Sequence, residues 1–407
     1  MQTNLADFIK DTPEGQEADA ILRTCVHCGF CLATCPTYQL LGDELDSPRG
    51  RIYLMKQVLE GATPTDKTQL HLDRCLTCRA CETTCPSGVQ YGRLVDIGRH
   101  IVAKRVKRSG FTAATRVALR KVIPNRSLFG ALLAMGRTVR PLLPGPIRSK
   151  VPLAQPAGPW PAQRHARRMI VLDGCVQPSM APNINSSAAR VLDRVGISLI
   201  RVAQAGCCGA VAHHLDAHSE ALDQVRRNID AWWPEIERGA EAIVVTASGC
   251  GTMVNDYGHL LRGDARNAEK AARVSALFRD LSAVVVGERD KLPTAYAKGR
   301  RIAVHSPCTL QHGLKIRGVV ESLLAEAGFA LTPVPDAHLC CGSAGTYSIL
   351  QPELSQQLRA NKIKALESGD PEEIVTANIG CLAHLAGATR RRVRHWVELI
   401  AEGQGEP

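Results

Sequence analysis

Two runs of cysteine near the N-terminus constrain this chain more than any other feature. Each run reads C-x2-C-x2-C-x3-C-P, and the runs begin at Cys25 and Cys75. This spacing is typical of proteins that bind two [4Fe–4S] clusters, where three close cysteines bind one cluster and the fourth binds the other. The sequence therefore predicts two sites, each built from both runs. One site would use Cys25, Cys28, Cys31 and Cys85, and the other Cys35, Cys75, Cys78 and Cys81.

Zinc sites and disulfide bonds are the alternatives for these cysteines. Zinc sites usually separate two cysteine pairs by about a dozen residues or more, whereas each run here packs three cysteines closely. Disulfide bonds need an oxidising compartment. The stretch Met1–Lys10 contains Asp7 and lacks the apolar core of a signal peptide. The 16 cysteines therefore indicate metal ligands in a reducing compartment. No apolar run is long enough to predict a membrane-spanning helix.

The residues around the two runs predict a helical domain. Apolar residues between the runs follow helical spacing at 52–59 and 67–72. We therefore expect an α-helical domain of the two-cluster ferredoxin type over residues 1–100. Four arginines either stabilise the cluster charge by hydrogen bonds or are solvated charges on helix faces. They are Arg49, Arg51, Arg74 and Arg79.

The net charge of +11 is concentrated in one segment. No acidic residue lies between Asp96 and Asp173, while 16 Lys or Arg do, and the remainder has 34 basic against 39 acidic residues. A local basic face argues against a general nucleic-acid partner. Residues 101–168 are expected to form a basic helical segment and a linker, with seven prolines in 141–161. The helical part would lie on an anionic bilayer, dock on a partner subunit or connect domains. The candidate lipid contacts are Arg116, Arg120 and Lys121.

The C-terminal half is an internal duplication. A lone cysteine, a Cys-Cys-Gly triplet and another lone cysteine recur at offsets of 133, 133 and 131 residues. A near-constant offset indicates two copies of one structural unit. We expect the copies at 169–295 and 296–407. Their cysteines are Cys175, Cys207, Cys208 and Cys250, and Cys308, Cys340, Cys341 and Cys381.

Each copy alternates short apolar strands with helical patterns. The predicted strands are 169–172, 197–202 and 242–246 in the first copy, and 302–305, 330–334 and 373–376 in the second. This βαβαβ order predicts parallel sheets, whose ligands collect at the carboxyl ends of the strands. The fold class is thus α+β and multidomain, with a helical ferredoxin domain followed by a duplicated βαβ domain. The second cysteine set would hold one or two further iron–sulfur centres, or else zinc or reduced thiols.

The sequence resembles a known family of iron–sulfur proteins. Beyond the two runs and the two Cys-Cys-Gly repeats, the resemblance is carried by longer phrases, including 25–31, 73–79, 205–210, 307–312 and 338–347. These phrases are similar to the iron–sulfur subunits of bacterial glycolate oxidases, across essentially the whole chain. The wider family includes lactate-utilisation proteins, the third subunit of anaerobic glycerol-3-phosphate dehydrogenase and the Cys-Cys-Gly subunit of heterodisulfide reductase.

The resemblance implies an oxidoreductase subunit that carries electrons. FAD-bearing partner subunits would oxidise glycolate to glyoxylate, with D-lactate as a second candidate substrate, while this chain passes electrons toward a quinone or membrane acceptor. It implies a peripheral position on the cytoplasmic side of the bacterial inner membrane. The chain has no G-x-G-x-x-G after a strand, so neither FAD nor NAD is expected in it.

Two alternatives remain open at this point, a Cys-Cys-Gly reductase in its own right and a redox sensor. Heterodisulfide reductases carry an extra cysteine three residues past the last one, where this chain has Met253 and His384. This departure argues against disulfide-cleaving chemistry. Five histidines near the repeats are expected to be structural or solvated rather than ligands. They are His213, His214, His305, His312 and His338.

Overall fold

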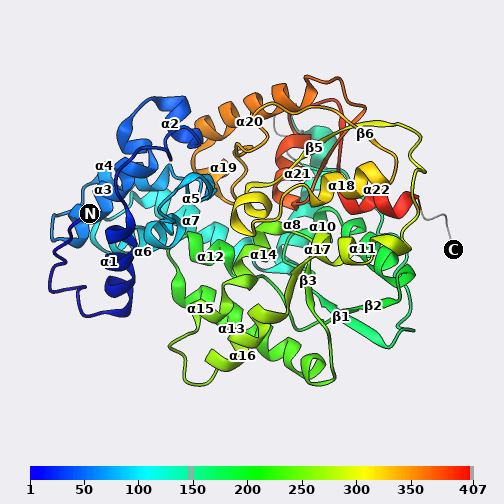
Figure 1. Ribbon diagram of the computed structural model, residues 1–407, viewed down its shortest axis with the longest axis horizontal. Coiled ribbons are helices and arrows are strands. Elements are labelled where there is room, and N and C mark those ends of the chain that lie inside the picture. The colour runs from blue at the N-terminus through cyan, green and yellow to red at the C-terminus, as the bar shows by residue number, and fades with distance from the viewer. Residues whose placement is uncertain (145–147, 149–150, 404–407) are drawn as a thin grey trace. The chain divides into compact units, whose positions relative to one another are not determined.

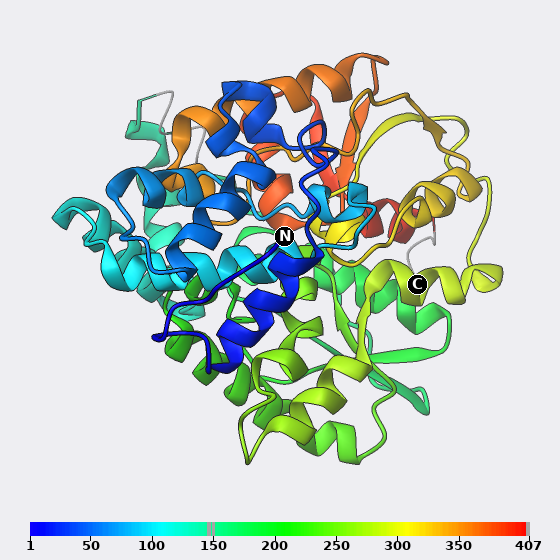
Figure 2. The same ribbon diagram turned by 60° about the vertical axis from the view of Figure 1, so that its left-hand side comes forward.

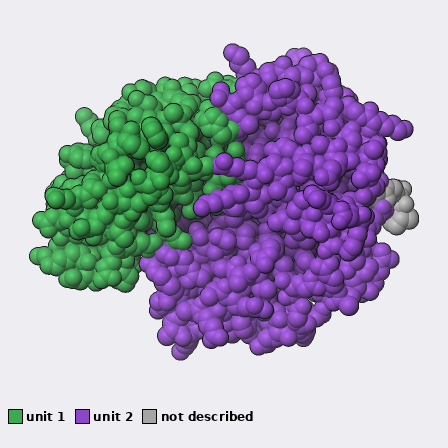
Figure 3. Space-filling view, viewed as in Figure 1, with its two compact units in different colours: residues 1–116, 311–313, 338–362 green, residues 117–310, 314–337, 363–407 purple. Residues whose placement is uncertain are grey.

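The computed structural model describes residues 1–144, 148 and 151–403. Part of the predicted proline-rich linker, residues 145–147 and 149–150, lies outside this description, as do residues 404–407. The chain forms two compact units (Figure 3). Unit 1 contains residues 1–116, 311–313 and 338–362, and unit 2 contains residues 117–310, 314–337 and 363–407.

Unit 1 is built from helices, as the spacing between the cysteine runs predicts. Thr12 and Ser47 cap α1 and α3 with their side chains, and each helix has proline at its first position. Leu22, Met55 and Leu94 are fully buried in the shared core. The helices between residues 13 and 122 are α1 (Pro13–Thr24), α2 (Pro36–Leu41), α3 (Pro48–Leu59), α4 (Asp66–Asp73), α5 (Ala80–Thr84), α6 (Tyr91–Arg105) and α7 (Gly110–Val122).

Unit 2 contains two parallel four-stranded sheets with the same strand order. Figure 1 shows β1, β2 and β3 of the first sheet close together. The first sheet runs β2-β1-β3-β4 and the second β6-β5-β7-β8, and every described pair is parallel. Figure 2 shows the orange-red strands of the second sheet side by side. The strands are β1 (Arg167–Val171), β2 (Ile197–Arg201), β3 (Ile243–Val245), β4 (Phe278–Asp280), β5 (Arg301–His305), β6 (Ala330–Leu331), β7 (Glu373–Thr376) and β8 (Arg392–His395).

Helices lie between successive strands, because two parallel strands need a long crossover connection. The helices that follow β1 in the chain are α10 (Gln177–Met180), α11 (Asn183–Arg194), α12 (Ala210–His214), α13 (His218–Glu237), α14 (Ser248–Asn255), α15 (Tyr257–Leu260), α16 (Ala268–Leu277), α17 (Leu281–Gly287), α18 (Val319–Glu326), α19 (Tyr347–Leu350), α20 (Pro352–Glu367), α21 (Ile379–Ala386) and, after the last strand, α22 (Trp396–Glu402). Helix α8 (Arg126–Val139) precedes the linker, and the short turns are η1 (Glu44–Asp46), η2 (Arg140–Leu142), η3 (Arg289–Lys291) and η4 (Thr309–Gly313). The duplicated α+β architecture predicted from the sequence is confirmed.

The two repeats share one hydrophobic core within unit 2. Ile184 of α11 and Leu399 of α22 are buried in the same cluster, and these two helices pack together. Asn183 donates to Glu398 across the same contact, with 2.8 Å between Nδ2 and Oε1. The two copies therefore stabilise each other through apolar burial and a buried hydrogen bond.

Two details differ from the expectation. Each sheet has a fourth strand that the sequence analysis did not predict, β4 and β8. The Cys-Cys-Gly triplets also do not follow their strands directly, because Cys207 lies six residues after β2 and Cys340 nine residues after β6. The triplets therefore belong to loops that extend beyond the sheet edges.

Candidate iron–sulfur sites

Both N-terminal cysteine runs are loops with the same backbone turns. His27 and Gly29 in the first run have φ of 56° and 86°, and Thr77 and Arg79 in the second have φ of 52° and 61°. These residues occupy equivalent places, two and four positions after the first cysteine of each run. Three of the four are not glycine, so the left-handed conformation carries strain that the surrounding structure must offset. The repeated turns direct successive cysteines toward one centre.

The first site brings together the four cysteines expected for it. Cys25, Cys28, Cys31 and Cys85 line one hollow, which Cys81 also lines. Burial, with the nearby Cys25 and Cys28 thiols, raises the pKa of Cys31 to about 11. Burial also raises the pKa of Cys25, with Cys85 adding to the effect. Because both pKa values are raised, these cysteines favour the protonated thiol in the absence of a bound cation. A bound metal would stabilise their thiolate forms.

His27 supports the fit of a bound group in this hollow. Its Nε2 is buried and has no hydrogen-bond partner among the described residues, and the ring lines the hollow. Buried polar atoms are normally paired, so an orphan here indicates space for a missing partner. Four soft sulfur donors around an empty volume suit an iron–sulfur cluster.

The second site is more deeply buried than the first. Burial raises the pKa of Cys81, and the thiols of Cys78, Cys75 and Cys35 are among its charged neighbours. Cys35, Cys75 and Cys81 are buried, whereas Cys28 of the first site is exposed. The buried Tyr91 directs its hydroxyl to Cys75, with 3.6 Å between Oη and Sγ. Cys85 of the second run thus lies with thiols of the first run, and Cys35 of the first run lies near Cys81 of the second. The division of the eight cysteines into two ligand sets stays a prediction.

The first repeat of unit 2 gathers its four cysteines at one edge of its sheet. The thiol of Cys207 is hydrogen-bonded to those of Cys175 and Cys208, and Cys208 also contacts Cys250. These thiol hydrogen bonds lower the pKa of Cys207, and Arg227 adds to the effect. Hydrogen bonding to Cys207 instead raises the pKa of Cys175. Cys175, Cys207 and Cys208 are each less than 9% exposed, so this is a compact, dry thiol site.

The cysteines of the second repeat are divided between the two units. Cys340 and Cys341 belong to a segment of unit 1, where the amide of Gly342 donates to Cys340 Sγ at 3.4 Å. Cys308 and Cys381 belong to unit 2, where Asn378 donates to Cys381 Sγ at 3.4 Å. Each pair is thus held by its own local hydrogen bond.

Comparison with known proteins gives matches that cover this whole arrangement. Residues 21–89 match the family of 4Fe–4S dicluster domains, and residues 169–255 and 302–386 each match the cysteine-rich domain family. The chain is 57% identical to the glycolate oxidase iron–sulfur subunit of Escherichia coli strain K12, over 99% of both chains. It is 30% identical to the probable glycolate oxidase iron–sulfur subunit of Bacillus subtilis strain 168, over 94% of both.

The chain belongs to the family of glycolate oxidase iron–sulfur subunits. Lactate utilization protein A of Anoxybacillus flavithermus is more distant, at 25% identity over 56% of this chain and 95% of that protein. The resemblance predicted from the sequence is confirmed, as is the prediction of two [4Fe–4S] clusters in the N-terminal domain.

Two buried side chains hold the triplet loop of the first repeat by hydrogen bonds that the sequence did not predict. Asn228 accepts from the Gly206 amide and donates to the Cys207 carbonyl, both at 2.8 Å. Tyr257 donates to the Cys208 carbonyl, also at 2.8 Å, and both side chains are fully buried. Asn228 interrupts the apolar face of α13, three residues after Val225 and four before Trp232. A polar residue at an apolar position of this helix is the sequence feature that could have indicated a buried hydrogen-bonding role for Asn228.

The four arginines proposed from the sequence have different surroundings. Arg51 is 1% exposed and pairs with Asp46, which also pairs with Arg74 at 2.8 Å. Arg49 and Arg79 pair with Glu44 and Glu82, at 2.7 and 2.9 Å. Only Arg51 combines full burial with a place beside the cysteines. The sequence analysis missed a second buried arginine, Arg99.

Met253 occupies the position where a related reductase would have another cysteine. It is 6% exposed, and its methyl group would lie 3.2 Å from a Cβ on Gly209. An apolar side chain therefore fills the space beside the triplet in place of a thiolate. This packing agrees with the departure noted in the sequence.

Three of the candidate histidines have a polar or aromatic neighbour within contact distance. His305 contacts Thr376 Oγ1 at 2.9 Å, and His312 contacts Thr83 Oγ1 at 3.0 Å. The ring of His213 stacks on that of His218, with 4.8 Å between centroids. Their structural interpretation stays a prediction for the holoprotein.

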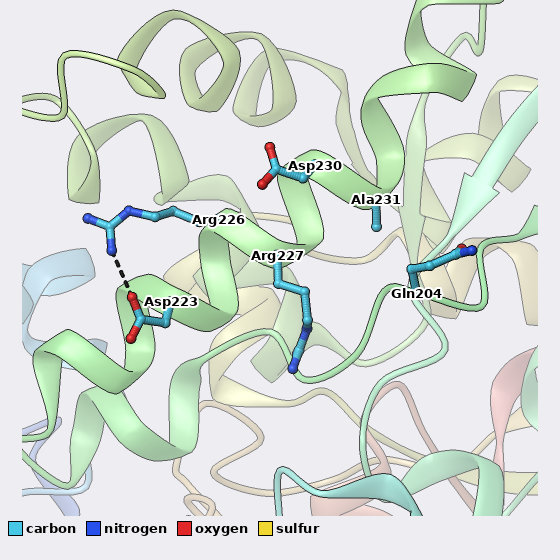
Figure 4. A pocket seen from close by; sticks show the side chains of 6 residues that line it. All are labelled: Gln204, Asp223, Arg226, Arg227, Asp230 and Ala231. Carbon is cyan, nitrogen blue, oxygen red and sulfur yellow. Dashed lines mark hydrogen bonds and ion pairs between the residues drawn. The ribbon is translucent and has the colours of Figure 1, made fainter.

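A surface hollow lies on α13 beside the first triplet (Figure 4). Arg226 pairs with Asp223 at 2.9 Å and with Asp264 at 2.9 Å. Arg227 extends away from this pair toward the triplet loop, where its Nη2 would lie 2.6 Å from a Cβ on Gly206. The other lining residues are Gln204, Asp230 and Ala231. The hollow thus exposes the arginine that stabilises the Cys207 thiolate.

Proposed function

We propose that this chain is the electron-transfer subunit of a glycolate oxidase complex. Glycolate gives up two electrons and two protons to become glyoxylate, and FAD-bearing partner subunits would accept both electrons. This chain would receive them one at a time and pass them toward a quinone or another membrane acceptor. The single observation that carries the proposal is that unit 1 gathers the cysteines of both runs in a chain 57% identical to a glycolate oxidase iron–sulfur subunit.

The proposed ligand sets are those that the spacing of the two cysteine runs predicts. Cys25, Cys28, Cys31 and Cys85 would hold one [4Fe–4S] cluster, and Cys35, Cys75, Cys78 and Cys81 the other. Cys175, Cys207, Cys208 and Cys250 would hold a further iron–sulfur centre, and the four cysteines of the second repeat are candidates for another. Such clusters supply one-electron transfer, which a two-electron flavin partner needs in order to release its electrons singly. The protein contributes thiolates, buried hydrogen bonds and exclusion of water.

Reconstitution tests the function directly. The purified chain should not oxidise glycolate with an artificial dye, and activity with a quinone analogue should require both this chain and the flavin subunits. In the complex carrying Cys81→Ser, glycolate should still reduce the flavin, while quinone reduction should fall at least tenfold. Glu60→Gln, a change at a partly exposed carboxylate away from the cysteines, serves as the matched control. Glycolate oxidation by the chain alone would contradict the proposal.

We also propose that α8 attaches the complex to an anionic membrane surface. Among the described residues, no helix is long and apolar enough to cross a bilayer. The expected lipid contacts are poorly placed, because Arg116 is buried and both Arg120 and Lys121 lie within 4 Å of Glu220. Helix α8 instead presents an apolar stripe within the acid-free segment, which suits an anionic bilayer. The stripe is Leu128, Leu132, Met135 and Val139, between 40% and 61% exposed.

Vesicle sedimentation tests this attachment. Met135→Glu should lower binding to phosphatidylglycerol vesicles at least tenfold, since it adds a charge to the apolar stripe and repels the anionic surface. Tyr53→Glu, at a residue 49% exposed in unit 1, is the matched control and should bind as the unaltered chain does. Equal binding by both variants would favour a partner subunit as the occupant of α8.

A further inference from the structure

Two buried guanidinium groups lie beside the second cysteine site of unit 1. Arg51 is 1% exposed and donates to the carbonyl of His71 at 2.7 Å, to Thr37 Oγ1 at 3.1 Å and to Asp46 Oδ1 at 3.1 Å. Thr37 is in turn 3.3 Å from Cys35 Sγ. Arg51 is therefore connected to a thiol of the second site through one hydroxyl group.

Arg99 approaches the same site from α6. It is 8% exposed and donates to the carbonyls of Leu72 and Cys75 at 2.7 and 2.5 Å, and to Thr77 Oγ1 at 2.9 Å. These contacts hold the start of the second cysteine run by its backbone. They also place a permanent positive charge beside Cys75, because a guanidinium does not lose its proton in proteins.

The first site has no comparable buried arginine among the charged residues described around it. Arg49 approaches its loop, but the side chain is 35% exposed and pairs with Glu44, which is 44% exposed. Solvent screens such a pair strongly. At the second site the charges are buried, where the low dielectric makes each one more effective. Asp46 pairs with Arg51, and Glu82, which lies near Cys81, pairs with Arg79. Arg99 therefore adds a buried positive charge that neither of these two carboxylates pairs with.

We propose that Arg51 and Arg99 make the second site the electron sink of the N-terminal pair. This inference rests on the proposed electron-transfer function and deepens it. Reduction adds one negative charge to a cluster, so buried cations favour the reduced state. The one-electron potential at Cys35, Cys75, Cys78 and Cys81 is then higher than at Cys25, Cys28, Cys31 and Cys85. An electron that arrives at the exposed first site moves to the second, and no bond forms or breaks.

The test is an anaerobic redox titration of the full chain with dithionite, followed by EPR. Cys85→Ser and Cys81→Ser, which alter one ligand of each site, assign the two signals. In Arg51→Gln and in Arg99→Gln, the second-site equilibrium constant for reduction should fall at least tenfold, or about 59 mV for one electron. The first-site signal should not move. Arg49→Gln is the matched control and should change neither signal by more than threefold.

A second set of variants separates charge from structure. Arg51→Lys keeps the positive charge but loses most of the hydrogen bonds. The reduction potential of the second site should therefore shift much less in Arg51→Lys than in Arg51→Gln. Asp46→Asn alone removes the offsetting anion and should raise the potential of the second site. A merely structural role would lower the potential in all of these variants, or leave it unchanged. Should Arg51→Gln fail to assemble, Asp46→Asn and Arg99→Gln still give opposite shifts.

Two results would overturn the inference. One is a second-site signal that moves less than threefold in both Arg99→Gln and Asp46→Asn while iron content is retained. The other is reduction of the first site before the second. Because dithionite replaces the flavin partner, these results do not depend on glycolate. Failure of the proposed function would appear separately, as the absence of glycolate-dependent reduction with the flavin subunits.

Discussion

The two cysteine-rich repeats share a backbone framework but differ in the polar groups buried within it. Both triplets end in a left-handed glycine, Gly209 with φ of 98° and Gly342 with φ of 84°. Each glycine lies against the backbone of the following helix, at Ala221 of α13 or Ser355 of α20. These contacts align the two helices residue by residue, and the close approach accounts for the shared Cys-Cys-Gly sequence.

The same alignment shows where the copies diverge. Asn228 lies seven residues after Ala221, and Lys362 lies seven residues after Ser355; both are buried, at 0% and 3% exposure. The last strands differ in a similar way, because Asp280 caps the helix after β4 while His395 caps the helix after β8. Duplication thus preserved the turns that require close packing. The polar and ionisable groups around the turns differ between the two copies.

The largest expected effect concerns the two triplet glycines. A Cβ on Gly342 would lie 2.6 Å from the Ser355 carbonyl oxygen and 2.9 Å from Leu358 Cβ, whereas one on Gly209 would meet atoms no closer than 3.2 Å. Gly342→Ala should therefore lower the free energy of unfolding by about 4 kcal/mol, from left-handed strain and overpacking together. Gly209→Ala should cost about 2 kcal/mol. Anaerobic denaturant unfolding measures both.

Gly196 provides the control for this comparison. It is also left-handed, with φ of 88°, but nothing lies within 4 Å of its Cβ position. Gly196→Ala should therefore show the conformational cost alone, about 1 kcal/mol. Equal losses at all three glycines would mean that close packing does not define the triplet turn.

The next effect distinguishes the two helix caps by pH. Burial lowers the pKa of His395 to about 4. Between pH 6.5 and 4 the unfolded chain binds a proton there that the folded chain refuses, so acidification should remove about 3 kcal/mol of stability. In His395→Asn this loss should disappear. The measurement compares denaturant unfolding at pH 7 and at pH 5, between which about 2 kcal/mol of this loss should appear.

Asp280 should give the opposite slope. Burial raises its pKa to about 6, so the folded chain keeps a proton that the unfolded chain releases, and stability falls as the pH rises from about 4 to 6. Asp280→Asn should remove this dependence and stabilise the protein at pH 7. Equal pH slopes in the two variants would contradict the assigned difference between the caps.

The smallest effect tests the hydrogen bonds that are specific to the first repeat. Asn228→Leu leaves the Gly206 amide and the Cys207 carbonyl without their side-chain partner, and should cost about 2 kcal/mol. Tyr257→Phe removes one hydroxyl and should cost about 1 kcal/mol. Denaturant unfolding of the two variants under the same conditions compares the two losses. A larger loss for Tyr257→Phe would show that the Tyr257 hydroxyl, rather than the Asn228 side chain, contributes more to holding the triplet loop.

Local patterns predicted much of this fold, and contacts between distant residues account for the rest. The cysteine spacing and the apolar runs predicted both sheets and the grouping of the first-repeat cysteines. Strand β4 has three residues and β8 reads Arg-Val-Arg-His, so neither has enough apolar residues to predict a strand. Arg99 contacts carbonyls 24 and 27 residues earlier in the chain, which no local pattern shows.

Unit 1 has a consequence for how the protein is made. Its helices at 1–116 leave the ribosome early, but the segment 338–362 that completes the unit is synthesised only after most of unit 2. The nascent chain must therefore hold eight reactive thiols in an unfinished fold while more than 200 further residues are translated. Protection of those thiols from oxygen during translation would then fall to the machinery that delivers iron and sulfide.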